Sequence, residues 1–337
     1  YHGSLLLSNT TDPFLLFKVE TEEPFRLPFF LKELGEFKYT FFHGWLDDFN
    51  IIGHRLAWKP INILELGANQ TVAYDKDRNY NFWLWPKVMI NTEENLGTTF
   101  DNDQRASIDV ALYIPFLSKI PYLGLTGGKL YAEYGGEDMF AWWQQEDKTW
   151  YGPFGFEFLA GGYMAGVFLT TGKTDFRFEH SENYITRPLF YDWYTEGFRA
   201  KWGVDANRAF QNPAWYRKVP FTYNGALLGH HMGPEGEDNY FEVKHRIGKF
   251  TITVSYDKER HRIYQTYYEQ AFRVTPEVRR SYGIDLLYSH NQWEVNVMAF
   301  YNKYKNVDAN PDPLQYDIKE GMNVDELVTG VGIKYLW

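Results

Sequence analysis

The chain has 337 residues, with 44 acidic and 34 basic side chains, a formal net charge of −10 and no cysteine. The acidic balance argues against nucleic-acid binding, because no basic stripe is available to displace counterions from phosphates. The lack of cysteine excludes disulfide scaffolds, thiolate zinc sites and thiol nucleophiles. Aromatic residues make up 19% of the chain, which predicts a folded protein rather than a disordered one.

Hydropathy does not decide between a soluble protein and a membrane barrel. No stretch of about 18 apolar residues occurs, which excludes a membrane-spanning helix. No basic segment precedes an apolar run at Tyr1, so we expect any signal peptide to have been removed or never to have been present. The mean hydropathy is −0.48, a value that a transmembrane barrel also gives because only alternate residues of its strands face lipid.

Alternation of apolar and polar residues predicts β-strands along the whole chain. In residues 250–257, for example, large apolar residues alternate with threonine, serine and aspartate. In chain order, the predicted strands cover residues 3–8, 13–20, 35–43, 51–59, 61–74, 106–114, 127–135, 154–171, 173–181, 221–230, 239–247, 249–257, 262–274, 278–289, 291–304 and 326–337. No linker, charge run or repeat divides the chain, so we expect a single domain over residues 1–337.

Aromatic residues end many of these runs, among them Tyr256, Tyr288, Tyr301, Tyr335 and Trp337. A membrane barrel places aromatic rings in this way, because amphipathic rings settle at the boundary between lipid and water. The alternative is a large soluble β-sandwich, propeller or carbohydrate-active domain, in which the aromatic residues fill a core.

The lengths of the connections favour the barrel. When connections are assigned alternately to two ends, the long ones at 75–105, 136–153, 182–220 and 305–325 all fall at one end. Tight turns at the other end are expected around residues 59–60, 171–173, 258–261 and 290–291. A glycine pair at 161–162 that splits strand 154–171 would reverse this parity, and the connections 21–34 and 115–126 are long for turns. Long loops opposite short turns are typical of outer-membrane barrels.

We therefore predict an all-β fold, a transmembrane antiparallel β-barrel of about 16 to 18 strands. A barrel of this size encloses an aqueous lumen unless loops or short helices partly fill it. Residues 190–211 are rich in aromatic residues without clean alternation, so we expect them to form such a filler.

Four passages of the sequence resemble capsule-assembly proteins of the Wzi family. Residues 52–60 and 64–68 resemble its "G-x-R-L…P…LELG" passage, and residues 101–109 resemble its "DNQxAxxD" segment. Residues 130–138 resemble "YxEYxGED", and residues 221–230 resemble "YxxGxxLGH". The family's glycine-rich stretch after LELG is replaced here by a charged segment at residues 74–79. From the resemblance we expect the chain to begin inside the barrel, with an N-terminal strand or hairpin missing.

The resemblance implies a bacterial outer-membrane barrel that binds or anchors capsular or extracellular polysaccharide as a lectin, without catalysis and without cofactors. The resemblance also implies contact of the barrel with membrane lipid or lipopolysaccharide. Other envelope proteins are possible partners. Two alternatives remain, a porin or saccharide-selective channel and a soluble β-rich glycoside-processing enzyme.

Candidate saccharide-binding residues combine aromatic rings, which stack on sugar C–H surfaces, with carboxylates, which accept hydroxyl hydrogen bonds. These candidates are Glu137, Asp138, Trp142, Trp143, Trp150, Trp193 and Trp202. The competing interpretation is that the tryptophans pin the loop across the barrel mouth.

Other polar motifs are interpreted as structural. We interpret His230 and His231 as adjacent strand residues, which point to opposite faces and cannot easily bind one ion, so we expect no metal site. The acidic pairs 22–23 and 237–238 are not placed across a cleft, so they do not indicate a glycosidase. Seven charges are expected to line the lumen, either as a selectivity lining or as a solvated interior: Lys38, Arg177, Glu179, Glu242, Arg246, Arg279 and Asp285.

Overall fold

The computed structural model describes most strands of the chain. The described residues are 13–46, 49–75, 102–120, 122, 124–141, 156–183, 222–223, 226–227, 230–232, 236–261, 264–267, 270–273, 277–307 and 321–335. The expected strand 3–8 and the expected filler at residues 190–211 lie outside them.

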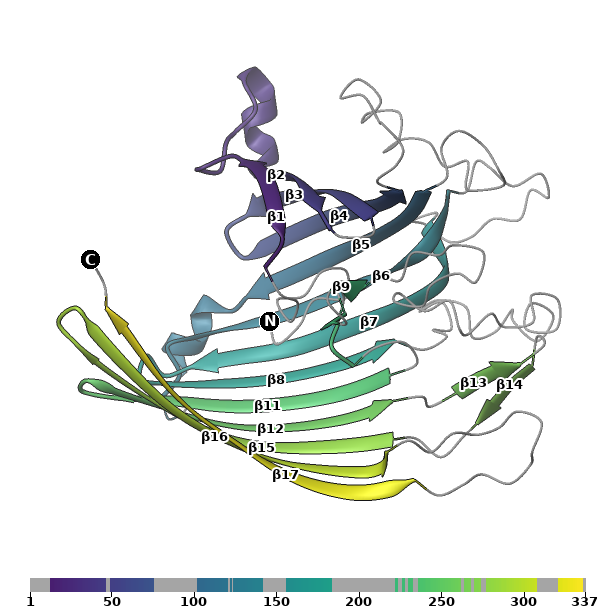
Figure 1. Cartoon of the computed structure of the whole chain (residues 1–337). Helices are drawn as coiled ribbons and strands as arrows, with labels where there is room; N and C mark the ends of the chain where they lie inside the picture. The colour runs from purple at the N-terminus through teal and green to yellow at the C-terminus, as the bar shows by residue number, and fades with distance from the viewer. Residues whose placement is uncertain are drawn as a thin grey trace.

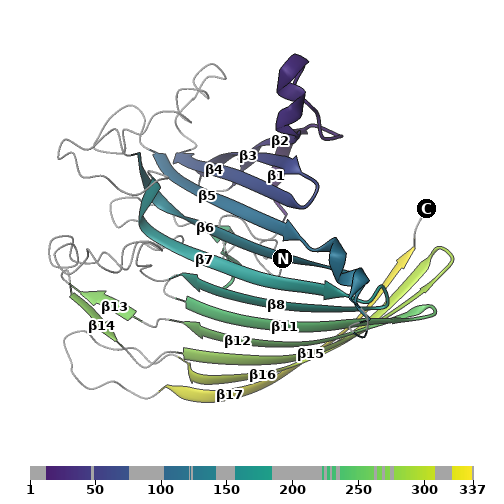
Figure 2. The same cartoon turned by 180° about the vertical axis from the view of Figure 1, so that it is seen from behind.

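A single antiparallel sheet of 13 strands forms the body of the described chain and curves into a trough (Figure 1, Figure 2). Its strands, in spatial order, are β1 (Leu15–Glu20), β2 (Glu36–Trp45), β3 (Phe49–Ile61), β4 (Leu64–Asp75), β5 (Asn102–Tyr113), β6 (Gly127–Ala141), β7 (Phe156–Thr170), β8 (Thr174–Asn183), β11 (Gly236–Ile247), β12 (Phe250–His261), β15 (Glu277–His290), β16 (Trp293–Val307) and β17 (Met322–Tyr335). Each strand pairs with the next one along this order, as in an up-and-down barrel wall. Within the described residues the sheet does not close, and β1 and β17 are its two edges.

Two expected strands are corrected by the structure. In the described part of the segment expected as strand 221–230, the structure has the two-residue strands β9 (Thr222–Tyr223) and β10 (Ala226–Leu227), which pair with each other. The segment expected as strand 262–274 forms a separate hairpin of β13 (Tyr264–Tyr267) and β14 (Gln270–Arg273). Both lie outside the main sheet, and the expected strand 3–8 lies outside the described residues, so the described sheet has 13 of the 16 strands expected from alternation.

Short turns gather at one end of the sheet, which we call the turn end. They join β3 to β4, β7 to β8, β11 to β12 and β15 to β16. Gly172 and Gly248 have φ values of 83° and 59°, a backbone conformation that glycine adopts without steric cost. The glycine pair at 161–162 does not split β7, but the turn expected around 258–261 is absent because β12 continues to His261.

The opposite end, which we call the loop end, receives the long connections as expected. Two longer segments at the turn end contain the 3₁₀ helices η1 (Phe29–Leu34) and η3 (Pro115–Lys119). None of the helices in the described part of the chain has the length and hydropathy needed to cross a bilayer.

The outward face of the sheet is apolar and exposed. On β12, β15 and the edge strand β17, Val254, Ile284 and Val331 retain 52%, 53% and 72% of their accessible surface. An exposed apolar face of this extent is unusual for a protein in water. Two rows of aromatic residues border the apolar stretch: Tyr256, Tyr282 and Tyr301 toward the loop end, and Phe250, Tyr288, Trp293 and Tyr335 toward the turn end.

The inward face is polar and largely buried. Glu259, Arg105 and Asn302 are only 1%, 2% and 3% exposed. Apolar cores are small, one around Phe49 and Ile51 and another around Tyr131 and Met164. The sheet is thus polar inside and apolar outside, the arrangement of a membrane β-barrel wall.

Candidate functional site

Residues of three separate motifs meet on the inward face of β3, β4 and β5. The Nη2 atom of Arg55 lies 2.9 Å from Oδ1 of Asp109, and its Nη1 atom also contacts the same carboxylate, so the guanidinium binds in the two-pronged manner that favours strong pairing. Nδ2 of Asn69 donates to the other Asp109 oxygen at 2.9 Å, and Glu65 lies 3.8 Å from Arg55. The passages 52–60, 64–68 and 101–109 therefore build one polar network.

Gly67 makes room for this network. It pairs in register with Asp109, and a Cβ atom at Gly67 would lie 2.2 Å from Oδ2 of that carboxylate. Any side chain here would displace the carboxylate from Arg55. The glycine of the "LELG" passage is thus required by the approach of Asp109.

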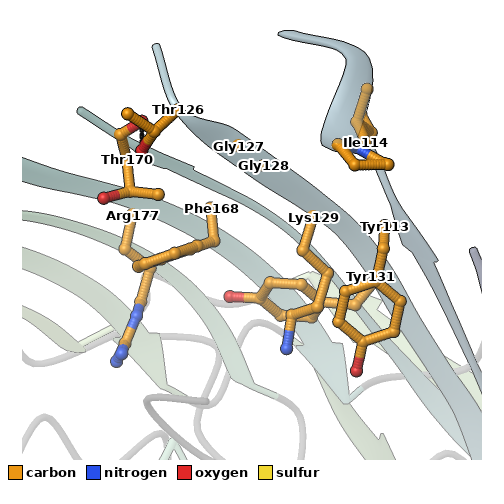
Figure 3. Close-up of a pocket in the computed structure, with 11 residues that line it drawn as sticks. Tyr113, Ile114, Thr126, Gly127, Gly128, Lys129, Tyr131, Phe168, Thr170 and Arg177 are labelled. Atoms are coloured by element: carbon orange, nitrogen blue, oxygen red, sulfur yellow. Dashed lines mark hydrogen bonds between the residues drawn. The ribbon is translucent and has the colours of Figure 1, made fainter. Parts of the chain in front are cut away.

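A pocket of about 490 Å³ opens on the inner wall at the turn end, between β5, β6, β7 and β8 (Figure 3). Its lining includes three aromatic rings and two cations, namely Tyr113, Tyr131, Phe168, Lys129 and Arg177. Nζ of Lys129 lies 4.7 Å from the centroid of the Tyr131 ring. Aromatic faces with nearby cations suit an anionic ring compound such as an acidic sugar, and the volume is in the range of ligand pockets.

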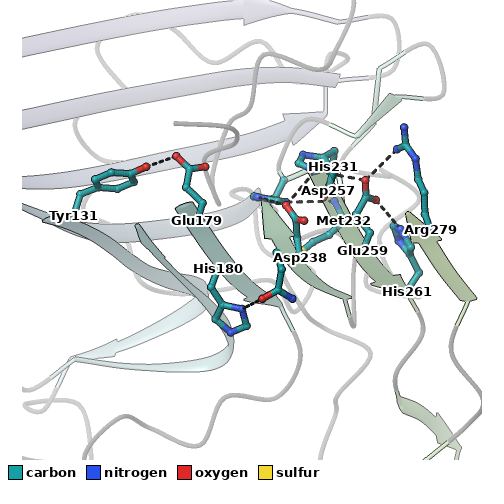
Figure 4. A network of polar contacts seen from close by, with 12 residues as sticks. Tyr131, Glu179, His180, His231, Met232, Asp238, Asp257, Glu259, His261 and Arg279 are labelled. Carbon is teal, nitrogen blue, oxygen red and sulfur yellow. Dashed lines mark hydrogen bonds and ion pairs between the residues drawn. The ribbon is translucent and has the colours of Figure 1, made fainter. Parts of the chain in front are cut away.

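A second group of polar side chains lies on the inner wall toward the loop end (Figure 4). His230 and His231 belong to a short turn before β11 and not to a strand. Their rings stack with centroids 4.3 Å apart, and both Nε2 atoms face Oδ2 of Asp238, at 3.8 Å and 3.3 Å. The expectation that the two rings point to opposite faces is therefore wrong, because it assumed a strand.

Glu259 joins this histidine group to neighbouring strands. Its carboxylate accepts from Nη1 of Arg279 at 3.0 Å and contacts Nε2 of His261 at 2.7 Å. His231 lies 3.8 Å from Glu259 and 4.0 Å from Asp257. Burial lowers the pKa of His231, against the opposing effect of the carboxylates around it, so burial favours its neutral ring.

The charges expected in the lumen lie on the polar face where the structure describes their contacts. Arg177 lies 4.0 Å from Glu242, and Glu179 accepts a hydrogen bond from the Tyr131 hydroxyl. Arg246 pairs with Asp175 at 2.6 Å near the turn end. The pairs Arg177–Glu242 and Arg246–Asp175 join the adjacent strands β8 and β11, and Glu179 reaches Tyr131 across β7, which fits a salt-bridged interior.

The predicted saccharide residues are placed only in part. Glu137 and Asp138 lie in β6 toward the loop end, where the backbone of Glu137 pairs with Arg105 and Ala160. The five tryptophans, Trp142, Trp143, Trp150, Trp193 and Trp202, lie outside the described residues. The saccharide subsite at the loop end stays a prediction.

Sequence reasoning missed the pocket at the turn end. Its residues come from four strands, and only their register brings them together. A signal was present, because Lys129, Tyr131 and Arg177 share the inward parity of their strands. The three rings of Tyr113, Tyr131 and Phe168 and the two cations on that face stand out against the threonine, serine and glycine found there elsewhere.

Comparison with known proteins gives one family. Residues 1–315 match the family model of capsule assembly protein Wzi. Among curated proteins no significant match is found.

Two solved structures resemble the fold to different degrees. Wzi from Escherichia coli, described as an outer-membrane protein of group 1 capsule assembly and a carbohydrate-binding β-barrel, aligns with a TM-score of 0.64 and 16% sequence identity. The alignment covers 100% of this chain and 64% of the E. coli protein, so this chain spans slightly less than two thirds of that length. OccAB4 from Acinetobacter baumannii aligns with a TM-score of 0.40 and 7% identity over 88% of this chain and 62% of that one, which is too distant to support an argument. The likeness to the E. coli protein establishes the fold.

Proposed function

The chain belongs to the Wzi family of capsule assembly proteins, and on that premise we propose that it holds capsular or extracellular polysaccharide at the cell surface as a noncatalytic binding protein. The observation that carries the proposal is the family match over residues 1–315. The E. coli protein of the same fold is described as carbohydrate-binding, which supports the same role here.

The chain resides in the bacterial outer membrane. Its family and its β-barrel fold are those of an outer-membrane protein. The exposed apolar face between two rows of aromatic residues supplies the surface that a bilayer covers. We propose that lipid and lipopolysaccharide contact this face, while polysaccharide is bound at the loop end.

The residue composition of the loop end supports saccharide binding. Glu137 and Asp138 lead from β6 into a segment that carries Trp142, Trp143 and Trp150. Carboxylates and indole rings together recognise the two surfaces of a sugar, its hydroxyl groups and its C–H faces. We propose these residues, with Trp193 and Trp202, as the saccharide contacts.

The test is retention of purified polysaccharide by the detergent-solubilised protein immobilised on a surface. We expect the wild type to retain capsular polysaccharide, and the double variant Trp142→Ala with Trp143→Ala to weaken retention by about 10-fold or more, in line with loss of aromatic anchors. Trp293→Phe is the matched control, because Trp293 lies in the outward aromatic row at the turn end. It should retain polysaccharide as the wild type does.

Two outcomes would contradict the proposal. Shortening of the polysaccharide during incubation would indicate an enzyme. Ion conductance in planar bilayers, together with no retention of any polysaccharide by the wild type, would indicate a channel.

A further inference from the structure

We propose that the inner wall near the loop end holds a divalent transition-metal ion, bound by His231, Asp238, Asp257 and Glu259. This inference is independent of polysaccharide binding. It concerns two overlapping groups of potential ligands, His230, His231 and Asp238 in one and His231, Asp257 and Glu259 in the other. His231 is common to both groups.

The strand register brings the three carboxylates together. Asp238 of β11 pairs directly with Glu259 of β12, and Asp257 follows on the same face two residues away. Residues paired across antiparallel strands have Cβ atoms about 5 Å apart, so their carboxylates can reach one point. The turn that carries His231 then places an imidazole above these acids (Figure 4).

The distances fit a metal site that closes by small movements. Nε2 of His231 lies 3.3 Å from Oδ2 of Asp238, 3.8 Å from Oε1 of Glu259 and 4.0 Å from Oδ2 of Asp257. Zinc binds nitrogen and oxygen at about 2.0–2.2 Å in tetrahedral geometry, which separates its ligand atoms by roughly 3.3 Å. The first pair already has this separation, and the other two need shifts of less than about 1 Å.

The charges also favour a cation. Asp238, Asp257 and Glu259 are 2%, 8% and 1% exposed, and ionised carboxylates are costly to bury unless they are paired or coordinate a metal. Arg279 and His261 both contact Glu259, and the two histidines of the turn lie 3.8 Å and 3.3 Å from Asp238. A divalent ion would neutralise this group and leave the histidine ring neutral, as metal binding requires.

The surroundings hold the ligands in place. Met232, next to His231, is fully buried in a cluster with Ala111, Tyr131 and Met164. Gly236 lies so close that a Cβ atom there would be 2.5 Å from the Met232 carbonyl oxygen. Arg279 and His261 orient Glu259, as outer partners do for carboxylate ligands in metal sites.

His230 is not assigned as a ligand. The Met232 amide donates to Nδ1 of His230 at 3.3 Å, so the neutral ring carries its proton on Nε2, the atom that faces Asp238. One imidazole with three carboxylates suits Zn²⁺ or Mn²⁺, whereas Ca²⁺ requires six to eight oxygen ligands. We therefore expect binding of Zn²⁺ and Mn²⁺ and weaker binding of Ca²⁺.

The test uses the full chain in detergent, treated with a chelator and then titrated with ZnCl₂, MnCl₂ or CaCl₂ in a calorimeter. We expect one Zn²⁺ per wild-type chain and a loss of affinity of about 100-fold for His231→Ala and for Asp238→Asn, at the upper end of effects seen around metal sites. His245→Gln is the matched control and should bind as the wild type does, because His245 lies toward the turn end of β11 and contacts Thr174.

A second measurement keeps the proposal falsifiable if a variant fails to fold. Wild-type protein loaded with Co²⁺ should show the visible absorption of a low-symmetry site with nitrogen and oxygen ligands, and added Zn²⁺ should remove it. Absence of stoichiometric binding by the wild type would overturn the proposal. Equal loss in His245→Gln, or unchanged affinity in a folded His231→Ala protein, would do the same, since either result would indicate adventitious binding.

Discussion

The two faces of β12 show how one alternating sequence meets two environments. Outward, Val254 is 52% exposed between Val243 and Ile284 on the neighbouring strands. Inward, Asp257 and Glu259 are 8% and 1% exposed. In a water-soluble sheet the apolar row would be buried, so the comparison indicates that lipid, and not a protein core, covers the outward face.

The outward face of β12 is apolar over only part of the strand. Beyond Tyr256 the outward positions of β12 become charged, at Lys258 and Arg260, and Arg260 pairs with Glu237 of β11 at 2.9 Å. The apolar stretch therefore ends at the aromatic row of the loop end. Charged residues above that row lie where a membrane protein meets headgroups and water.

Arginine substitutions on the two faces should give the largest difference. Val254→Arg places a charge on the outward face near the middle of the apolar stretch, and we expect it to lower the free energy of unfolding by about 2–4 kcal/mol. Thr253→Arg points inward beside Asp285, with which it pairs in register, and should cost far less. The measurement is reversible urea unfolding in lipid vesicles or detergent.

Equal losses for Val254→Arg and Thr253→Arg would contradict the assignment of the two faces. Recovery of folded, monodisperse wild-type protein from buffer without detergent would contradict it more directly, since the apolar face would then need a protein partner.

The inner face should respond to loss of a charge partner rather than to added charge. Asp109→Asn removes the carboxylate that binds Arg55 and Asn69, and we expect the free energy of unfolding to fall by about 1–3 kcal/mol. Glu294→Gln is the control, because Glu294 faces Lys334 at 3.8 Å in an exposed pair and such pairs contribute about 0–1 kcal/mol. The same unfolding assay compares them, and similar losses would mean that the network around Asp109 contributes no more than a surface pair.

The alternation of apolar and polar residues predicted the strands of the main sheet, because on nearly every strand the inward residues are polar and the outward residues are apolar. It failed for 221–230 and 262–274, since a few alternating residues are also compatible with a short hairpin. Each of these two extra strands reverses the alternation between the two ends of the sheet, so together they restore it. The long connections were therefore assigned to the correct end, although the turn expected at 258–261 was wrong.

The site was less predictable, for a physical reason. Arg55, Glu65 and Asp109 are far apart in sequence, and only the register of three strands joins them. The histidine pair was misjudged because the direction of a side chain in a turn cannot be derived from the period of a strand. The tryptophans of the predicted saccharide subsite lie outside the described residues, and the subsite stays a prediction.

The smallest effect is expected in the aromatic row at the loop end. The Tyr282 ring lies 5.3 Å from that of Tyr256 and 6.4 Å from that of Tyr301, between centroids, and is 45% exposed. Tyr282→Ala should lower the free energy of unfolding in lipid vesicles by about 1 kcal/mol, the usual contribution of such aromatic pairs. Tyr282→Phe keeps both ring contacts and should cost less than half as much. If the phenylalanine variant instead lost as much as alanine, the hydroxyl group at the lipid boundary, and not ring packing, would be what stabilises this row.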